Sequence, residues 1–168
     1  ELLKIMQTFR AEQASALESY RVVGTLHDID DLRQCMLATS KPVTDYFVIA
    51  THYVRFLQRY AGLNPYSHVV DIGCSWGYLA FALANYLTDA GGYLGIEVQE
   101  EPITWARQHL AWLGGNFEFE HVDLKNDYYN PEGDEPRGAV RLPIQDGWAN
   151  SILAGSVFTH MQEDGVQS

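Results

Sequence analysis

The sequence predicts an α/β fold: a Rossmann-like, doubly wound, mainly parallel sheet, preceded by an N-terminal helical extension. Three observations lead to this prediction. Beyond residue 64, short apolar runs typical of strands alternate with longer stretches that have helical periodicity. Strands that alternate with helices form parallel βαβ units with right-handed crossovers. The first of these strands also runs into a glycine-bearing turn, and 168 residues suffice for one buried core.

We divide the chain into a helical segment, residues 1–64, and a sheet domain, residues 65–168. Within the first segment, apolar residues at helical spacing predict three helices. The first carries a stripe from Leu2 to Tyr20, the second spans 27–39, and the strongest spans 42–62 and ends at Gly62.

The sheet domain is predicted to alternate four strands with two helices, and a long polar connection, 125–147, precedes the last strand. Loops of that length are usually functional or disordered. The predicted strands are 68–73, 93–98, 116–124 and 149–158, and the predicted helices are 77–90 and 100–114.

Composition excludes several classes of partner. The chain has 22 acidic and 11 basic residues, a net charge of −11, and no cluster of Lys or Arg that would follow phosphates. We therefore expect neither nucleic acid nor membrane partners. Two cysteines, Cys35 and Cys74, form no disulfide framework, and the six histidines lack metal-ligand spacing, so we expect no metal and a cytoplasmic location.

The stretch "DIGCSWG" is the most informative turn. Core packing gives no evident reason for glycine at both Gly73 and Gly77, whereas glycine after a strand lets a ligand approach the backbone. The alternative is a tight turn that merely needs glycine. The dinucleotide pattern G-x-G-x-x-G fails, because Ser75 and Tyr78 stand at its second and third glycines. Asp71 suits a ligand with a positive group, so NAD is not expected.

These residues carry a family resemblance. "VVDIGCSWG" resembles the first motif of class I S-adenosylmethionine-dependent methyltransferases, an acidic residue followed by G-x-G-x-G. Glu97 ends the second predicted strand, and Asp123 ends the third. "LPIQDGWANSILAGSVFTHM" resembles the family's fourth-strand region. The match covers about 65–161, and its specificity lies in four elements in the right order.

The resemblance implies S-adenosyl-L-methionine as cofactor and a role for each matching residue. Glu97 would accept hydrogen bonds from both ribose hydroxyls, and Asp123 would accept one from the adenine amino group. The remaining implied cofactor residues surround the rest of the ligand: Val98 or Leu124 against the adenine ring, Asp71 and Gly73 at the methionine ammonium, Ser75 and Gly77 in the turn, Gly155 and Ser156 along the amino-acid portion. The alternatives are a solvated charge at Glu97 and a turn-initiating aspartate at Asp123.

Two departures from the family pattern stand out. Ser75 replaces the usual second glycine, which we expect to weaken cofactor approach without abolishing it. Asn150 stands where the fourth strand often has an acidic residue, which puts the local structural role of that position in doubt.

The resemblance implies methyl transfer by in-line displacement to a small-molecule acceptor, as in bacterial members of the family. His160 is the candidate general base, with capping or packing of a helix as its alternative. Tyr128, Tyr129 and Asn130 would shape the acceptor pocket, unless their loop is simply a mobile acidic surface. The family sheet continues past a fourth strand, so we expect this chain to be a piece of a longer protein. A non-catalytic nucleotide-binding domain and a dehydrogenase-like domain are the competing interpretations.

Overall fold

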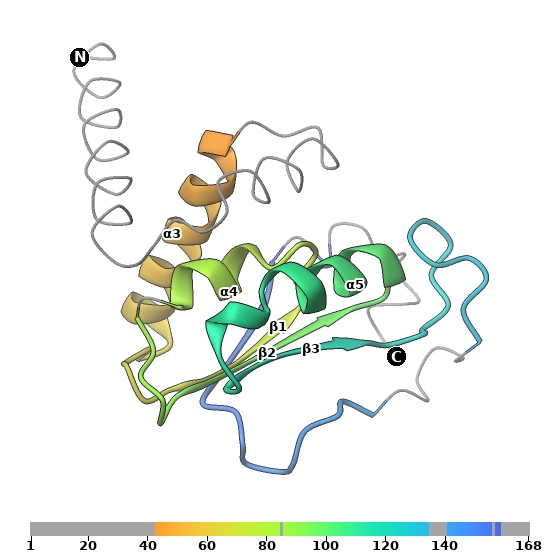
Figure 1. Cartoon of the computed structure of the whole chain (residues 1–168). Helices are drawn as coiled ribbons and strands as arrows, with labels where there is room; N and C mark the ends of the chain where they lie inside the picture. The colour runs from red at the N-terminus through yellow and green to blue at the C-terminus, as the bar shows by residue number, and fades with distance from the viewer. Residues whose placement is uncertain (1–42, 85, 135–140, 156, 159–168) are drawn as a thin grey trace.

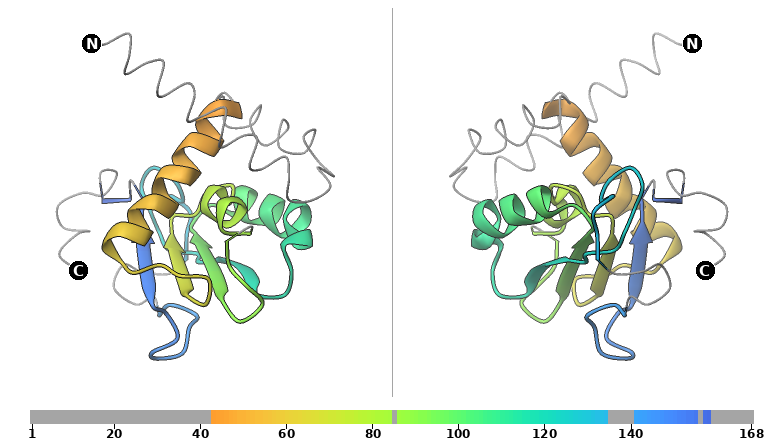
Figure 2. Two further views of the ribbon diagram at one scale, coloured as in Figure 1. Left: turned by 90° about the vertical axis from the view of Figure 1, so that its left-hand side faces the viewer. Right: turned by 90° about the vertical axis from the view of Figure 1, so that its right-hand side faces the viewer.

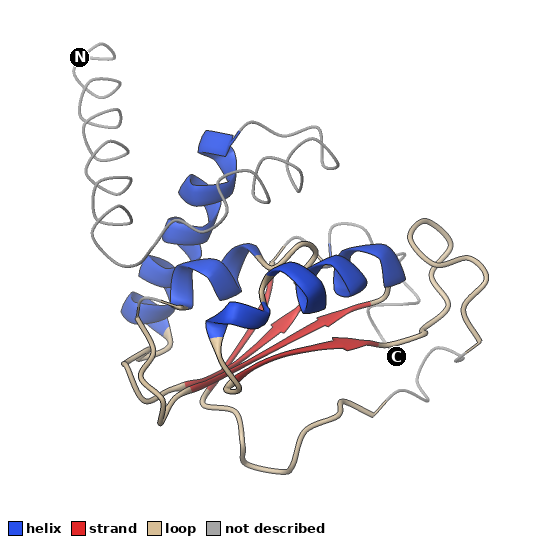
Figure 3. Cartoon of the chain, viewed as in Figure 1, coloured by secondary structure: helices blue, strands red, loops and turns tan. Residues whose placement is uncertain are grey.

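Four parallel strands form a single sheet in the order β3-β2-β1-β4 (Figures 1 and 3). The strands are β1 (His68–Ile72), β2 (Gly92–Glu97), β3 (Phe117–His121) and β4 (Ser151–Ala154). This computed structural model describes residues 43–84, 86–134, 141–155 and 157–158. The predicted helices before residue 43, together with Cys35, Ser156 and His160, lie outside the described residues.

The connections make the sheet doubly wound, as the sequence predicts. From β1 the chain passes through α4 (Tyr78–Leu83) to β2, and through α5 (Glu100–His109) to β3. It then returns to the opposite side of β1 to form β4. The strand order therefore reverses between β1 and β4, and ligands of open α/β sheets bind beside the carboxyl ends of strands at such a reversal.

Three helices cover one face of the sheet, α4 and α5 together with α3 (Val43–Tyr60), as the two side views show (Figure 2). α5 packs on β2 and β3, while α3 packs along α4. The buried core on this face combines helix residues such as Leu57, Leu79 and Ile103 with strand residues such as Tyr93 and Phe119. None of the described helices is long and apolar enough to cross a membrane.

The second face of the sheet is covered by the chain that precedes β4, and this part of the described chain contains no helix. Val70, Leu94 and Ile96 are buried there beneath Ile144 and Trp148. Apolar side chains on both faces of β1 and β2 explain why their sequences read as nearly continuous hydrophobic runs.

The predicted helix 77–90 is wrong in length, because α4 ends at Leu83. Tertiary hydrogen bonds take over directly afterwards. The backbone N–H and the hydroxyl of Thr88 both donate to the Pro65 carbonyl, and the Tyr86 hydroxyl donates to the Leu63 carbonyl. The chain is thereby drawn toward the segment before β1 instead of continuing along the helix axis.

The other predicted elements within the described residues are found with shorter bounds, except β2, which keeps its predicted length and begins one residue earlier. α3 ends at Tyr60, and Gly62 follows at φ +67° in the left-handed conformation that favours glycine. The helix predicted over 100–114 divides into α5 and a 3₁₀ turn, Ala111–Leu113. At the start of β4, the Asn150 side-chain oxygen accepts the His68 N–H at 2.7 Å, which ties β4 to β1 and gives this departure from the family pattern a structural role.

Substitution of the turn glycine should test how tightly this core is packed. A Cβ at Gly77 would lie 2.5 Å from Leu110 Cδ1 and 3.3 Å from Phe119 Cε1, at φ +79°. We expect Gly77→Ala to lower the free energy of unfolding by roughly 2–4 kcal/mol, from left-handed strain plus overpacking. Gly62→Ala is the matched control, because its φ of +67° is similar but no atom lies within 4 Å. It should cost about 1 kcal/mol. Equal losses in urea unfolding would contradict this account.

Candidate functional site

The turn from β1 into α4 has an unusual backbone. Gly73, Ser75 and Gly77 all have positive φ, at +73°, +51° and +79°. Ser75 is the only non-glycine residue with positive φ in the described part of the chain. This conformation crowds the Cβ atom of any residue other than glycine. A glycine would therefore suit the position of Ser75 better.

Hydrogen bonds fasten this turn to the carboxyl end of β2. The N–H groups of Gly73 and Cys74 donate to the Ile96 carbonyl at 2.8 and 3.1 Å. The Ser75 N–H donates to the Glu97 carboxylate at 3.0 Å. The turn is thus held as a rigid cap over β2.

Packing favours glycine at both positions, which corrects the expectation that core packing gives no reason for them. A Cβ at Gly73 would lie 2.7 Å from the Val157 side chain, which follows β4. The space beside Gly77 is filled by core side chains. Gly77 therefore serves the fit of α4 against its neighbours.

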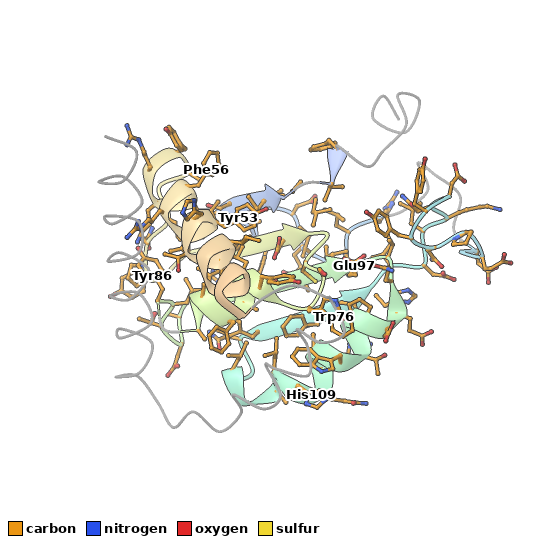
Figure 4. All side chains as sticks on the ribbon, turned by 90° about the horizontal axis from the view of Figure 1, so that it is seen from above. Tyr53, Phe56, Trp76, Tyr86, Glu97 and His109 are labelled. Carbon is orange, nitrogen blue, oxygen red and sulfur yellow. The ribbon has the colours of Figure 1, made fainter. Side chains whose placement is uncertain are left out.

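Glu97 is a buried carboxylate at the carboxyl end of β2, and only 8% of its surface is exposed. Its Oε2 accepts the Ser75 N–H, and its Oε1 accepts the N–H groups of Val98 at 2.8 Å and Gln99 at 3.2 Å. The alternative interpretation, a solvated surface charge, is therefore wrong. Figure 4 shows Glu97 toward the same end of the sheet as Trp76 of the turn.

The hydrogen bonds of Glu97 limit what a ligand can add. A carboxylate has about four acceptor positions, two on each oxygen. Oε1 already accepts two N–H groups and Oε2 accepts one. One position remains on Oε2, enough for one hydroxyl, whereas the sequence predicted that Glu97 would serve two.

Asp71 lies on β1 beneath the turn, with 5% of its surface exposed. Burial away from water raises its pKa from 3.8 to about 7, the Tyr93 hydroxyl opposes this by donating at 2.9 Å, and the nearby charge of Glu97 adds to the increase. Asp71 thus changes protonation near neutral pH, unlike an ordinary carboxyl group.

Cys74 is a buried thiol in the same turn. Burial raises its pKa well above the ordinary range, and the charges of Asp71 and Glu97 raise it further. Because the thiolate is the reactive form, this cysteine is a poor nucleophile.

Asp123 follows β3 and holds the loop behind it. Its carboxylate accepts the side-chain N–H of Asn130 at 2.8 Å and the backbone N–H of Asp134 at 3.3 Å. These hydrogen bonds, Asn130 first, lower its pKa. Asp123 thus organises a turn, as its alternative interpretation stated, while its position beyond β3 keeps it at the same sheet edge as Glu97.

The loop after Asp123 is ordered by its own side chains. Asn126 accepts the backbone N–H groups of Tyr128 and Tyr129, and Asn126 also pairs with Asn130 through two backbone hydrogen bonds. Tyr128 is 75% exposed at its tip. A structured loop thus presents tyrosines to solvent, where the sequence left open a mobile one.

The remaining predicted residues lie near the same edge. Val98 and Leu124, the predicted adenine neighbours, are half-buried. His121 of β3 links Val98 to the sheet, because its Nε2 lies 3.0 Å from the Val98 carbonyl oxygen. Gly155 follows β4, and a Cβ there would lie 2.7 Å from the Tyr53 hydroxyl of α3. Among the described residues no group of three or more side chains is arranged to hold a metal.

Sequence reasoning missed three residues of this region, Tyr53, Tyr93 and Gly95. A buried tyrosine in a strand needs a hydroxyl partner, and glycine inside a strand often marks a close approach; both signals are present in "YLGIE". A Cβ at Gly95 would lie 2.9 Å from the Tyr93 hydroxyl and 2.8 Å from Cys74 Sγ. Nothing in the sequence places Tyr53 beside β4.

Comparison with known proteins identifies the family. The model for protein-L-isoaspartate(D-aspartate) O-methyltransferase matches residues 36–128, more than half of the chain. The chain belongs to this family. The methyltransferase resemblance predicted from the glycine turn, Glu97 and Asp123 is therefore confirmed at the level of the family.

Solved structures of methyltransferases also resemble this member of the protein-L-isoaspartate O-methyltransferase family. One is a SAM-dependent methyltransferase from Aquifex aeolicus, with 26% identity and a TM-score of 0.36 over 40% of this chain and 37% of that one. A protein-L-isoaspartate O-methyltransferase has 22% identity and a TM-score of 0.36 over 39% and 21%. PKMT2 from Rickettsia typhi, solved with AdoHcy, has 22% identity and a TM-score of 0.41 over 67% and 20%. The chain spans well under half the length of these proteins.

The pKa of Asp71 predicts how stability depends on pH. The pKa of Asp71 is about 7 in the folded state and 3.8 in the unfolded state. Between these two pH values the folded state therefore keeps a proton that the unfolded state has lost. The free energy of unfolding should fall as pH rises from about 4 to above 7, by on the order of 4 kcal/mol.

Asp71→Asn should flatten this part of the pH dependence, because asparagine cannot ionise yet still accepts the Tyr93 hydroxyl hydrogen bond. Urea unfolding of both proteins at pH 4–8 measures the difference, and the variant's own curve removes contributions from other titrating groups. Parallel curves would show that the Asp71 carboxyl is not protonated in the folded state.

Proposed function

We propose that this chain binds S-adenosyl-L-methionine and forms part of a methyltransferase. The observation that carries the proposal is the buried Glu97 carboxylate at the carboxyl end of β2, fastened to the positive-φ turn after β1. It lies one strand from the reversal in strand order, where ligands of such sheets bind. Membership of an O-methyltransferase family supports the same conclusion.

The residues present fit such a ligand. Glu97 Oε2 has one acceptor position left for a ribose hydroxyl. Asp123 lies at the neighbouring strand end for the adenine amino group, and Asp71 beneath the turn favours a cationic methionine end. The other proposed contacts follow the sequence prediction: Gly73, Ser75, Gly77, Val98, Leu124, Gly155 and Ser156.

When bound, the cofactor supplies a methyl group on a positively charged sulfur. The protein must bind it, orient the acceptor in line and exclude water. A carboxylate acceptor is already nucleophilic and needs no base, whereas a hydroxyl or an ammonium acceptor does. His160 remains the proposed base for the second kind of acceptor only.

For the acceptor, we propose the carboxylate of an L-isoaspartyl or D-aspartyl residue in a polypeptide. The description of the matched family supports this class. The exposed Tyr128 and Tyr129, on a loop held by Asp123, would offer an apolar and hydrogen-bonding surface for a peptide. The small-molecule acceptor expected from the sequence is the second candidate. We also propose that the chain has neither nucleic acid nor membrane partners, which the net charge of −11 supports. The proposed cytoplasmic location rests on the two cysteines, which form no disulfide framework.

Binding of S-adenosylhomocysteine tests the cofactor site. We expect calorimetry to detect binding of S-adenosylhomocysteine to the 168-residue chain and to detect no binding of NADH. Glu97→Gln should raise the Kd about tenfold to a hundredfold, because a charge-assisted hydrogen bond to ribose is lost. Glu118→Gln, at an exposed carboxylate of β3, is the control and should leave the Kd unchanged. Binding of NADH instead would favour the dehydrogenase-like interpretation.

Methyl incorporation tests the acceptor. With labelled S-adenosylmethionine, a peptide containing L-isoaspartate should accept label, whereas the same peptide with L-aspartate should accept little. Label on small acceptors alone would favour the second candidate. Cofactor binding without transfer to any acceptor would favour the non-catalytic domain.

A further inference from the structure

Asp71 lies in a polar cluster with Tyr93 and Cys74, buried within the helix-covered face of the sheet. The family motif includes Asp71 but does not specify Tyr93. Val69 of β1 pairs with Tyr93 of β2, and Asp71 pairs with Gly95. Asp71 is two residues beyond Val69, so its side chain lies on the same side of the sheet as that of Tyr93. The Tyr93 hydroxyl donates to Asp71 Oδ2 at 2.9 Å, and Tyr93 itself is 0% exposed.

Gly95 makes this contact possible. It stands opposite Asp71 in the sheet, and a Cβ there would lie 2.9 Å from the Tyr93 hydroxyl oxygen. The same Cβ would lie 2.8 Å from Cys74 Sγ. The absence of a side chain at Gly95 therefore gives the hydroxyl and the thiol room beneath the turn.

Resting on the proposed function, we propose that Tyr93 is a positioning residue of the cofactor site: its hydroxyl holds the Asp71 carboxylate beneath the turn, where that carboxylate favours a cationic ligand. Tyr93 touches no ligand in this account. It acts through Asp71, because a hydrogen bond to the charged form of an acid stabilises that form.

Few other groups could stabilise the ionised form of Asp71. Among the residues that the structure describes, the titratable groups that interact with Asp71 are Glu97 and Tyr93 on β2 and Cys74 in the turn. The neighbouring elements add apolar side chains to this core: Leu153 on β4, Leu79 and Leu83 on α4, and Ile103 on α5. The Glu97 charge opposes ionisation of Asp71, so the Tyr93 hydroxyl is the described group that favours it.

Ligand binding should therefore be linked to a proton. Free Asp71, with a pKa of about 7, is largely protonated at pH 6. A ligand that carries an ammonium group binds better to the ionised carboxylate, so the proton passes to the buffer as the ligand binds. Affinity should then rise with pH and level off above about pH 7.

The test is the pH profile of S-adenosylhomocysteine binding, measured by calorimetry from pH 5.5 to 8.5 in buffers of different ionisation enthalpy. For the wild type we expect proton release near pH 6. Tyr93→Phe keeps the ring but loses the donor, so the midpoint should move up by about one pH unit, with about tenfold weaker binding at pH 6 and equal binding at high pH. Asp71→Asn should abolish this dependence.

Tyr86→Phe is the matched control, because it also removes one tyrosine hydrogen bond, that from the half-buried Tyr86 hydroxyl to the Leu63 carbonyl at 3.1 Å. It should leave the midpoint in place. A loss of affinity in Tyr93→Phe that is uniform across pH would assign Tyr93 a merely structural role and overturn the inference. Failure of the ligand to bind the wild type at any pH would overturn the proposed function instead.

If Tyr93→Phe does not fold by circular dichroism, carboxyl ¹³C titration of the wild type decides the question. Asp71 should titrate near pH 7 in the free protein and lower when S-adenosylhomocysteine saturates it. A titration that the ligand leaves unchanged would overturn the inference.

Discussion

The structure of this region depends on the attachment of the turn after β1 to the carboxyl end of β2. Ile96 and Glu97 together accept three consecutive N–H groups of that turn, those of Gly73, Cys74 and Ser75. The left-handed conformations in the turn are what bring these N–H groups to one edge. Because β1 and β2 are parallel and in register, the turn, Glu97 and Asp71 are fixed relative to one another by backbone hydrogen bonds.

The two buried acids next to this turn, Glu97 and Asp71, have different surroundings. Glu97 accepts three backbone N–H groups, one from Ser75 of the turn and two from the residues that follow β2, so one of its three hydrogen bonds also fastens the turn. Asp71 is more deeply enclosed, and burial outweighs the Tyr93 hydroxyl in setting its pKa. Three hydrogen bonds therefore hold the Glu97 carboxylate in place and leave it one acceptor position. The protonation of Asp71, by contrast, depends on the charges close to it.

The strands, α3 and the position of Glu97 could be predicted from sequence because they depend on local patterns: apolar runs, helical spacing and an acidic residue at a strand end. The length of α4 could not, since it is set by hydrogen bonds from Thr88 to Pro65, far away in the sequence. The same holds for the contacts of Tyr93 with Asp71 and of Tyr53 with Gly155, which require strand register and helix placement to be known first. The packing of Gly77 against Leu110 could not be predicted either, because this contact leaves no trace in the sequence.

The hydrogen bonds of the turn also bear on which ligands suit it. In dinucleotide-binding sheets, backbone N–H groups of the glycine turn and the helix that follows it meet a pyrophosphate. Here the N–H groups of Gly73, Cys74, Ser75 and Gly77 all donate within the protein. The side chains beneath and beside them, Asp71 and Glu97, are acids. We expect such an edge to repel phosphate and to attract hydroxyl and ammonium groups. The physical chemistry of the turn therefore supports the proposed ligand, a nucleoside with a cationic tail, over a dinucleotide.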